Sequence, residues 1–145
     1  MNEKIEKAYC ATKIYVQWGD MDAAQHVNNT VYLRWMETGR IAMFEKMNLG
    51  AFEQESVFPI LAWQDCKYIF PVTFPDQVTI TYDITELEED RVQCQGRVYS
   101  KKHQKLVAIS NCTLMAYDIK NAKKMPFPGK WKNALIHFYG ESIIK

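Results

Sequence analysis

The stretch from Trp18 to Arg40, WGDMDAAQHVNNTVYLRWMETGR, decides the fold of this chain. Its first half, Gly19 to Asn29, combines carboxylate, imidazole and carboxamide side chains without helical or strand periodicity, which is typical of a polar loop. Its second half begins a helix expected from about Thr30 to Met47, because apolar residues recur at helical spacings. That stripe consists of Tyr32, Trp35, Met36, Met43 and Met47. A polar loop therefore runs directly into a helix N-terminus, whose free N–H groups favour negative charge.

The composition predicts one globular domain. The chain has 145 residues, of which 48% are hydrophobic and 24% are charged, and this is ordinary usage for a single domain over residues 1–145. A formal net charge of +1 gives no electrostatic footprint for nucleic acid. The N-terminal segment is charged and no run approaches the ~20 apolar residues of a membrane span. We therefore expect a cytoplasmic protein with neither nucleic acid nor membrane as a partner.

The cysteines indicate no metal site. Cys10, Cys66, Cys94 and Cys112 are widely scattered and form no CxxC pair, so neither a zinc site nor a redox motif is predicted. We expect reduced thiols, most of them in the core.

From Val57 onward the sequence is typical of β-structure. Alternating residues predict strands over 13–18, 77–85 and 92–99. Branched and aromatic residues predict a strand over 57–70, and a run that is apolar on both faces predicts a long last strand over 106–117. Gly50 is expected to end the long helix, with a short turn over 51–55, and a short terminal helix is expected over 130–139.

This order of elements predicts an α+β architecture, in which an antiparallel five-stranded sheet wraps around one long central helix. One helix cannot cover five strands. The uncovered apolar surface therefore predicts a homodimer or a homotetramer.

The polar loop and the helix together resemble a family signature. Asp20-Met21-Asp22 precedes His26-Val27-Asn28-Asn29, and the helix opens with Tyr32-Leu33 and carries Glu37 and Arg40. This pattern resembles the 4-hydroxybenzoyl-CoA thioesterase branch of the hotdog-fold acyl-CoA thioesterases, and the likeness covers about residues 13–128. Gln25 departs from it, since family members often have glycine there. The resemblance implies a single hotdog domain, followed by a short helix and tail over 129–145.

The resemblance implies hydrolysis of acyl-CoA thioesters to a free acid and CoA, without a metal and with no cofactor besides the CoA of the substrate. Asp22 is implied as the nucleophile or as the base for the attacking water, and the backbone N–H of Asn29 as a donor to the thioester oxygen. The physical requirement agrees, because a carboxylate must sit beside the thioester carbon while N–H donors hold the developing oxyanion. From the residues alone, capping or bracing of the loop is the alternative role for Asp22.

Other residues of this stretch are candidates with two interpretations each. His26 is either a catalytic group or a hydrogen-bond partner of the loop. Asn28 is expected to position the loop and to contact the substrate, and Asp20 to brace the loop. Glu37 is expected to pair with Arg40 along the helix. Alternatively, Glu37 is the reacting carboxylate, as in another branch of hotdog thioesterases.

Candidates for substrate binding also lie on other segments. Tyr32, Trp63 and Tyr68 either line an acyl pocket or belong to the core. Lysines that are candidates for binding CoA phosphates form two clusters. One is Lys101, Lys102 and Lys105, and the other is Lys120, Lys123 and Lys124.

Two other functions remain open at this point. A hotdog hydratase or dehydratase acting on enoyl thioesters would need a histidine and an acid poised on the carbon chain of the substrate. A non-catalytic protein that binds acyl thioesters would need only the pocket.

Overall fold

The long helix expected from the apolar stripe is present as α2 (Asn29–Lys46) in the computed structural model, which describes residues 3–49 and 56–145. Asn28 is its N-cap, with a side chain that accepts a hydrogen bond from the Thr30 N–H. Beyond the other end, Asn48 takes the left-handed conformation, with φ 58°, which asparagine tolerates better than most residues. The helix end expected at Gly50 and the turn over 51–55 lie outside the described residues.

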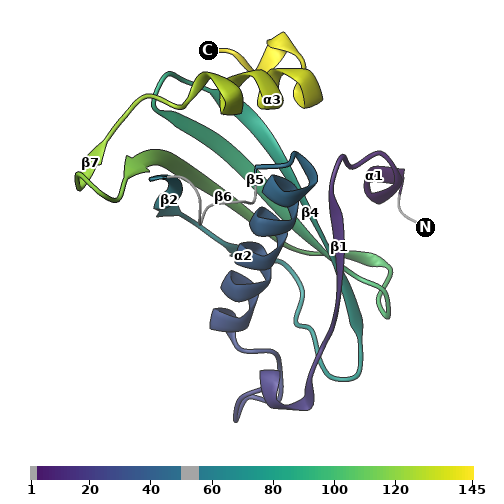
Figure 1. Ribbon diagram of the computed structural model, residues 1–145. Helices are drawn as coiled ribbons and strands as arrows, with labels where there is room; N and C mark the ends of the chain where they lie inside the picture. The colour runs from purple at the N-terminus through teal and green to yellow at the C-terminus, as the bar shows by residue number, and fades with distance from the viewer. Residues whose placement is uncertain (1–2, 50–55) are drawn as a thin grey trace.

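The described sheet contains seven strands, all antiparallel (Figure 1). The main path runs β1-β4-β5-β6-β2. These strands are β1 (Ala11–Tyr15), β2 (Val57–Gln64), β4 (Gln77–Leu87), β5 (Arg91–Ser100) and β6 (Lys105–Asp118). Two further strands of two residues each, β3 (Lys67–Tyr68) and β7 (Lys123–Lys124), also pair with β6.

The predicted strand number of five is therefore wrong. The 14-residue β6 is longer than its neighbours β5, with 10 residues, and β2, with 8 residues. The parts of β6 that extend beyond its pairing with β2 and β5 pair with β3 and β7 instead, because unpaired backbone N–H and C=O groups form a template for another strand.

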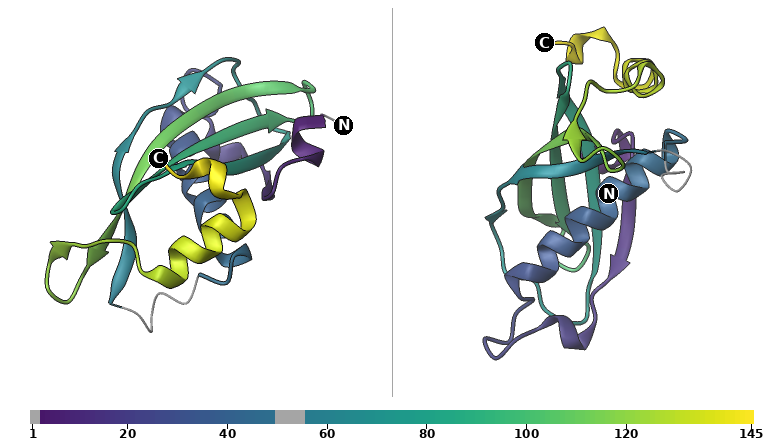
Figure 2. Two further views of the ribbon diagram at one scale, coloured as in Figure 1. Left: turned by 90° about the horizontal axis from the view of Figure 1, so that it is seen from above. Right: turned by 60° about the vertical axis from the view of Figure 1, so that its left-hand side comes forward.

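The sheet curls around α2 (Figure 2), and two glycines allow the close approach. A Cβ atom at Gly39 of α2 would lie 2.6 Å from Ile80 Cγ2, and one at Gly96 of β5 would lie 2.4 Å from Tyr82 Cε2. Both distances are far below van der Waals contact. The helix and the fully buried side chains Ile80 and Tyr82 therefore occupy the space that larger residues at 39 and 96 would need.

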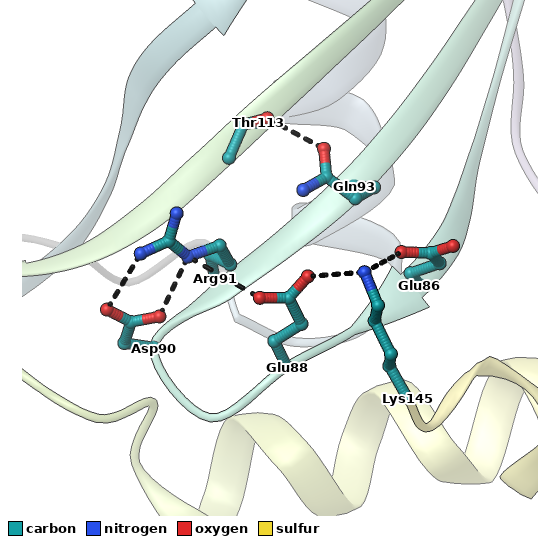
Figure 3. Close-up of polar contacts among 7 residues, drawn as sticks. All are labelled: Glu86, Glu88, Asp90, Arg91, Gln93, Thr113 and Lys145. Atoms are coloured by element: carbon teal, nitrogen blue, oxygen red, sulfur yellow. Dashed lines mark hydrogen bonds and ion pairs between the residues drawn. The ribbon is translucent and has the colours of Figure 1, made fainter.

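The C-terminal segment lies across one end of the sheet (Figures 1 and 2). It consists of α3 (Gly129–Tyr139) and the 3-10 turn η3 (Glu141–Ile143), close to the helix predicted over 130–139. Trp131 and Ile143 are buried. At the terminus, Lys145 Nζ lies 3.4 Å from a carboxylate oxygen of Glu86 and 3.4 Å from one of Glu88 (Figure 3). These exposed pairs add little stability, so the buried apolar side chains hold the segment in place.

The N-terminal helix α1 (Glu3–Glu6) and η1 (Trp18–Asp20) are the remaining elements, and neither was predicted. All four cysteines are free, three of them buried. In the part of the chain that the structure describes, no cluster of His, Cys, Asp and Glu side chains could hold a metal ion. None of the described helices combines the length and the apolarity needed to cross a bilayer.

Candidate active site

A tight turn presents Asp22 immediately before α2. Met21 and Val27 form an isolated antiparallel bridge, the Asp22 N–H donates to the His26 carbonyl at 3.2 Å, and the Gln25 N–H donates to the Asp22 carbonyl at 2.9 Å. Gln25 closes this turn in the left-handed region, with φ 62°. Glycine adopts this conformation without strain, which explains why the resembled family often has glycine at this position.

Asp20 braces the loop, as expected. Its Oδ2 accepts the Gln17 N–H at 2.8 Å, and its carbonyl accepts the Asn28 N–H at 2.9 Å. The Asp20 carboxylate thus holds the short turn η1, which directly precedes Met21 and Asp22 in the chain.

The Asp22 carboxylate is exposed and is held by two donors. Its Oδ2 accepts a hydrogen bond from Asn28 Nδ2 at 2.7 Å, and its Oδ1 accepts the Ala24 N–H at 2.8 Å. The Asn28 amide, followed by the Ala24 N–H, lowers the pKa of Asp22 below its ordinary value of 3.8, because both donors favour the charged form. The side chain is therefore ionised at neutral pH and fixed in one orientation.

Asn28 links this carboxylate to the start of α2. Its Oδ1 accepts the Thr30 N–H at 2.9 Å and the Thr30 hydroxyl at 2.6 Å, while its Nδ2 donates to Asp22. The neighbouring Asn29 N–H has no hydrogen-bond partner among the described residues, as expected for a first-turn donor. The capping residue Asn28 thus bonds the ionised Asp22 carboxylate through its side chain and directly precedes the available N–H of Asn29 in the chain.

Two cavities border the loop, and they divide the predicted residues between them. Asp22 lines a cavity of about 620 Å³ with Thr73 and Phe74. His26 and Asn29 line a second cavity, of about 270 Å³. The buried Val27, whose N–H donates to the Val72 carbonyl, lies between them in sequence. Within one chain, Asp22 and Asn29, the residue whose N–H is expected to hold the oxyanion, therefore line different cavities.

Two predicted aromatic residues meet at the helix start. The Tyr68 hydroxyl donates to the Asn29 carbonyl at 3.3 Å, and burial raises the pKa of Tyr68 to about 12. Its ring packs edge-on against Tyr32 with centroids 5.1 Å apart. Tyr32 is buried and its hydroxyl accepts the Val72 N–H at 3.3 Å. Tyr68 and Tyr32 both line the cavity of His26, although Tyr32 also belongs to the core.

The remaining candidates line neither cavity. Trp63 lies on β2 with 55% of its surface exposed. Lys101 and Lys102 lie at the turn between β5 and β6, where the Lys102 N–H donates to Asp76. Glu37 lies two turns into α2 and lines a separate cavity of about 230 Å³.

The expected ion pair between Glu37 and Arg40 is absent from the described residues, so that interpretation is corrected. Arg40 turns inward, where only 9% of its surface is exposed, and its Nη1 donates to Gln64 Oε1 at 2.9 Å and to the Tyr82 hydroxyl at 3.2 Å. Both acceptors are distant in sequence. Because the Arg40 guanidinium is buried among neutral acceptors, it does not pair with Glu37, whose side chain is exposed to solvent.

The sequence interpretation missed Thr73 and Phe74, which also line the Asp22 cavity. They lie between Pro71 and Pro75. Prolines at this spacing are typical of a turn, but they carry no signal that the turn packs beside Asp22.

Comparison with known proteins places this geometry in a family. Residues 16–135 match the model of the thioesterase-like superfamily. Among curated proteins, none matches the chain significantly. A putative thioesterase from Pseudomonas aeruginosa is 25% identical with a TM-score of 0.79, and the match covers 89% of this chain and 99% of that one.

Two further solved structures share the fold at lower identity. A 1,4-dihydroxy-2-naphthoyl-CoA thioesterase from Synechocystis is 17% identical, with a TM-score of 0.77 over 87% of this chain and 94% of that one. A DHNA-CoA thioesterase from Staphylococcus aureus is 14% identical, with a TM-score of 0.81 over 93% and 97%. The curled sheet around α2, together with the family match over most of its length, shows that the chain belongs to the thioesterase-like superfamily, whose fold is the hotdog.

Proposed function

We propose that this protein hydrolyses acyl-CoA thioesters to a free acid and CoA, with Asp22 as the reacting carboxylate. The observation that carries the proposal is the 2.7 Å hydrogen bond from Asn28 Nδ2 to Asp22 Oδ2. It fixes an ionised carboxylate beside the first turn of a long helix. Membership of the thioesterase-like superfamily supports thioester hydrolysis in general, and the local geometry supports this assignment of roles.

We assign Asp22 the role of nucleophile. Its lowered pKa keeps it ionised at neutral pH, which both nucleophilic attack and general-base catalysis require. Attack of an Asp22 oxygen on the thioester carbon breaks the carbon–sulfur bond and gives a mixed anhydride and the CoA thiolate, which takes up a proton. Water then hydrolyses the anhydride, which releases the acid and regenerates Asp22.

Backbone donors at the start of α2 are suited to the carbonyl oxygen, which becomes negative in this step. The Asn29 N–H is available, and the positive end of the helix dipole adds to it. The Tyr68 hydroxyl holds the Asn29 carbonyl and so fixes the peptide that follows the donor. His26 borders the same cavity and we assign it a role in positioning the thioester rather than in proton transfer.

We further propose a cytoplasmic homodimer or homotetramer in which a second chain completes the site. β2 pairs with β6 on one side only, and its Ile60, Leu61 and Trp63 side chains are exposed. A long exposed apolar edge strand is a template for pairing with another chain. A partner strand along β2 would also shield the cavity that Asn29 shares with Tyr68, which lies just beyond β2 in the sequence.

The test measures the hydrolysis of a panel of acyl-CoA thioesters, with release of the free thiol as the readout. We expect Asp22→Asn to lower turnover on the order of 10²-fold or more. Glu37→Gln is the matched control, because it neutralises the other candidate carboxylate, and it should retain turnover. Both variants should unfold at nearly the temperature of the parent protein. Full turnover by Asp22→Asn would refute the mechanism, and loss of turnover only in Glu37→Gln would move the chemistry to the helix.

The same panel addresses the two alternatives. Hydration of an enoyl thioester without thiol release would indicate a hydratase, and tight binding of a nonhydrolysable analogue without turnover would indicate a binding protein. The structure favours neither. Within one chain His26 and Asn29 line one cavity and Asp22 lines the other, so this geometry does not distinguish a hydratase from a thioesterase, and the assay decides.

A further inference from the structure

A further cavity is lined by basic side chains. It shares no lining residue with the two cavities that border the Asp22 loop. Its volume is about 320 Å³, at the lower end of the range for small-molecule pockets. Three lysines contribute to its walls, and none of the described residues that line it is acidic. They are Lys13 of β1, Lys101 of the turn after β5, and Lys105 at the start of β6.

The strand register places this cavity on the outer face of the sheet. Lys13 lies opposite Thr79, and Thr79 lies opposite Tyr99, so the three side chains project from the same face of adjacent strands. The alternate residues of β4, Val78 and Ile80, are fully buried in the core on the side of α2. The cavity is therefore separated from the core by the sheet itself.

The three lysines of this cavity form no direct ion pairs. Lys13, Lys101 and Lys105 are exposed, and none has an ion-pair partner among the described residues. The Lys105 ammonium lies 4.0 Å from the centre of the Phe70 ring, a contact that orients the amine without cancelling its charge.

Asp76 does not line the cavity, but its carboxylate holds the segments that do. Its Oδ1 accepts the Gln77 N–H at 2.7 Å and the Lys102 N–H at 2.9 Å, and its Oδ2 accepts the Ser100 hydroxyl. The carboxylate is occupied by these three donors, which fasten the turn between β5 and β6 to the start of β4. The lysines of the turn are thus presented on a fixed segment.

The second lysine cluster of the chain has a different environment. Lys123 and Lys124 form the short strand β7, which pairs with β6. Neither they nor Lys120 line any of the cavities described above. Of the two clusters expected to bind phosphates, only the first therefore surrounds one of these cavities.

Tyr99 forms part of the wall of this cavity, with only 4% of its surface exposed. Within the described residues, its hydroxyl is the one fully buried side-chain oxygen or nitrogen without a hydrogen-bond partner. The charged groups that act on this hydroxyl are Arg97 and Asp83, so the ring shapes the wall and the lysines supply the polar contacts of the cavity.

We propose that this cavity binds the phosphate groups of a nucleotide, with Lys13, Lys101 and Lys105 as the cationic contacts. Phosphate is the ligand chemistry that several unpaired ammonium groups around one hollow select. The source of the phosphates is either the nucleotide end of CoA, an option that rests on the proposed function, or a separate nucleotide. Binding itself requires no hydrolysis.

The first experiment measures binding of the adenosine bisphosphate that forms the nucleotide end of CoA, by calorimetry on the intact protein. We expect the triple variant Lys13→Ala, Lys101→Ala, Lys105→Ala to weaken binding by about tenfold or more, from three charge contacts of ordinary strength. The triple variant Lys120→Ala, Lys123→Ala, Lys124→Ala removes the same charge elsewhere and should bind like the parent protein. Added salt should weaken binding, because these amines are exposed.

Absence of binding by the parent protein overturns the proposal, and so does equal weakening by the two triple variants, which would indicate only a general effect of net charge. Thermal unfolding of each variant identifies any that fail to fold. If one does, the single substitutions Lys13→Ala and Lys105→Ala replace it.

The second experiment distinguishes the two sources of phosphate. If the nucleotide end of CoA occupies the cavity, the cavity variant raises KM for an acyl-CoA while leaving KM for the corresponding acyl-pantetheine unchanged, and adenosine bisphosphate competes with acyl-CoA. If a separate nucleotide binds, neither KM changes. Hydrolysis of acyl-pantetheine tests the proposed function alone, so failure of one proposal is recognised independently of the other.

Discussion

Replacement of Asn28 by aspartate is expected to preserve the cap of α2 while raising the pKa of Asp22. The aspartate retains an acceptor for the Thr30 N–H, now bonded at 2.9 Å, and asparagine and aspartate are nearly equivalent caps. It removes the amide that donates to Asp22 Oδ2 at 2.7 Å and places a second carboxylate there. Because like charges disfavour ionisation, the pKa of Asp22 should rise.

Two further substitutions separate the effects. Asn28→Ala removes both the cap and the donor, and loss of the cap alone should cost about 1 kcal/mol, which lowers Tm by roughly 3–5 °C in a chain of this size. Asn28→Ser keeps a capping oxygen and loses the amide without adding charge, so its Tm should stay close to that of the parent protein. Its Asp22 pKa should return toward the ordinary value of 3.8.

The assay is thiol release from an acyl-CoA as a function of pH. The acidic limb of kcat/KM should lie at the lowest pH in the parent protein, higher in Asn28→Ser and highest in Asn28→Asp. Because the pKa of Asp22 is lowered in the folded protein, its bonds stabilise the fold above the unfolded pKa, and that contribution is lost as pH falls through the folded pKa. Identical acidic limbs in all three proteins would refute the claim that Asp22 must be ionised for the reaction.

Three other predictions concern the fold and the assembly. Gly96→Ala should lower the free energy of unfolding by roughly 1–3 kcal/mol in urea titrations, because the new Cβ would lie 2.4 Å from Tyr82 Cε2; unchanged stability would show that the helix and sheet are loosely packed. Gln25→Gly should raise stability by up to ~1 kcal/mol, since φ at this position is 62° and glycine carries no left-handed penalty; a lower Tm would contradict this. Leu61→Lys on the exposed edge of β2 should convert the proposed dimer to a monomer in sedimentation experiments, and an unchanged mass would place the interface elsewhere.

Features encoded by neighbouring residues were predictable from the sequence. The helix expected over 30–47 is present as Asn29–Lys46, because its apolar stripe is a local signal. The bracing of the loop by Asp20 also spans only a few residues. The hydrogen bond between Asn28 and Asp22 is equally local, but it was not predicted.

Features that depend on distant partners were not predictable in this way. Arg40 was paired with Glu37 on spacing alone, yet its guanidinium bonds Gln64 and Tyr82, which the sheet brings to it from elsewhere in the chain. Burial of the arginine among neutral acceptors outweighs an exposed ion pair that would contribute little. The wall that Thr73 and Phe74 form around Asp22 is set by the same tertiary packing.

The position of β6 in the chain has a consequence for biosynthesis. Val57 of β2 lies opposite Asp118 of β6, and Lys67 of β3 lies opposite Ile109, so both strands emerge from the ribosome long before their only partner. At translation rates of ~5–20 residues per second, β2 waits for roughly 3–12 seconds. During that interval the backbone N–H and C=O groups of β2 have no strand to pair with, so the nascent segment is open to pairing with other chains until β6 has been synthesised.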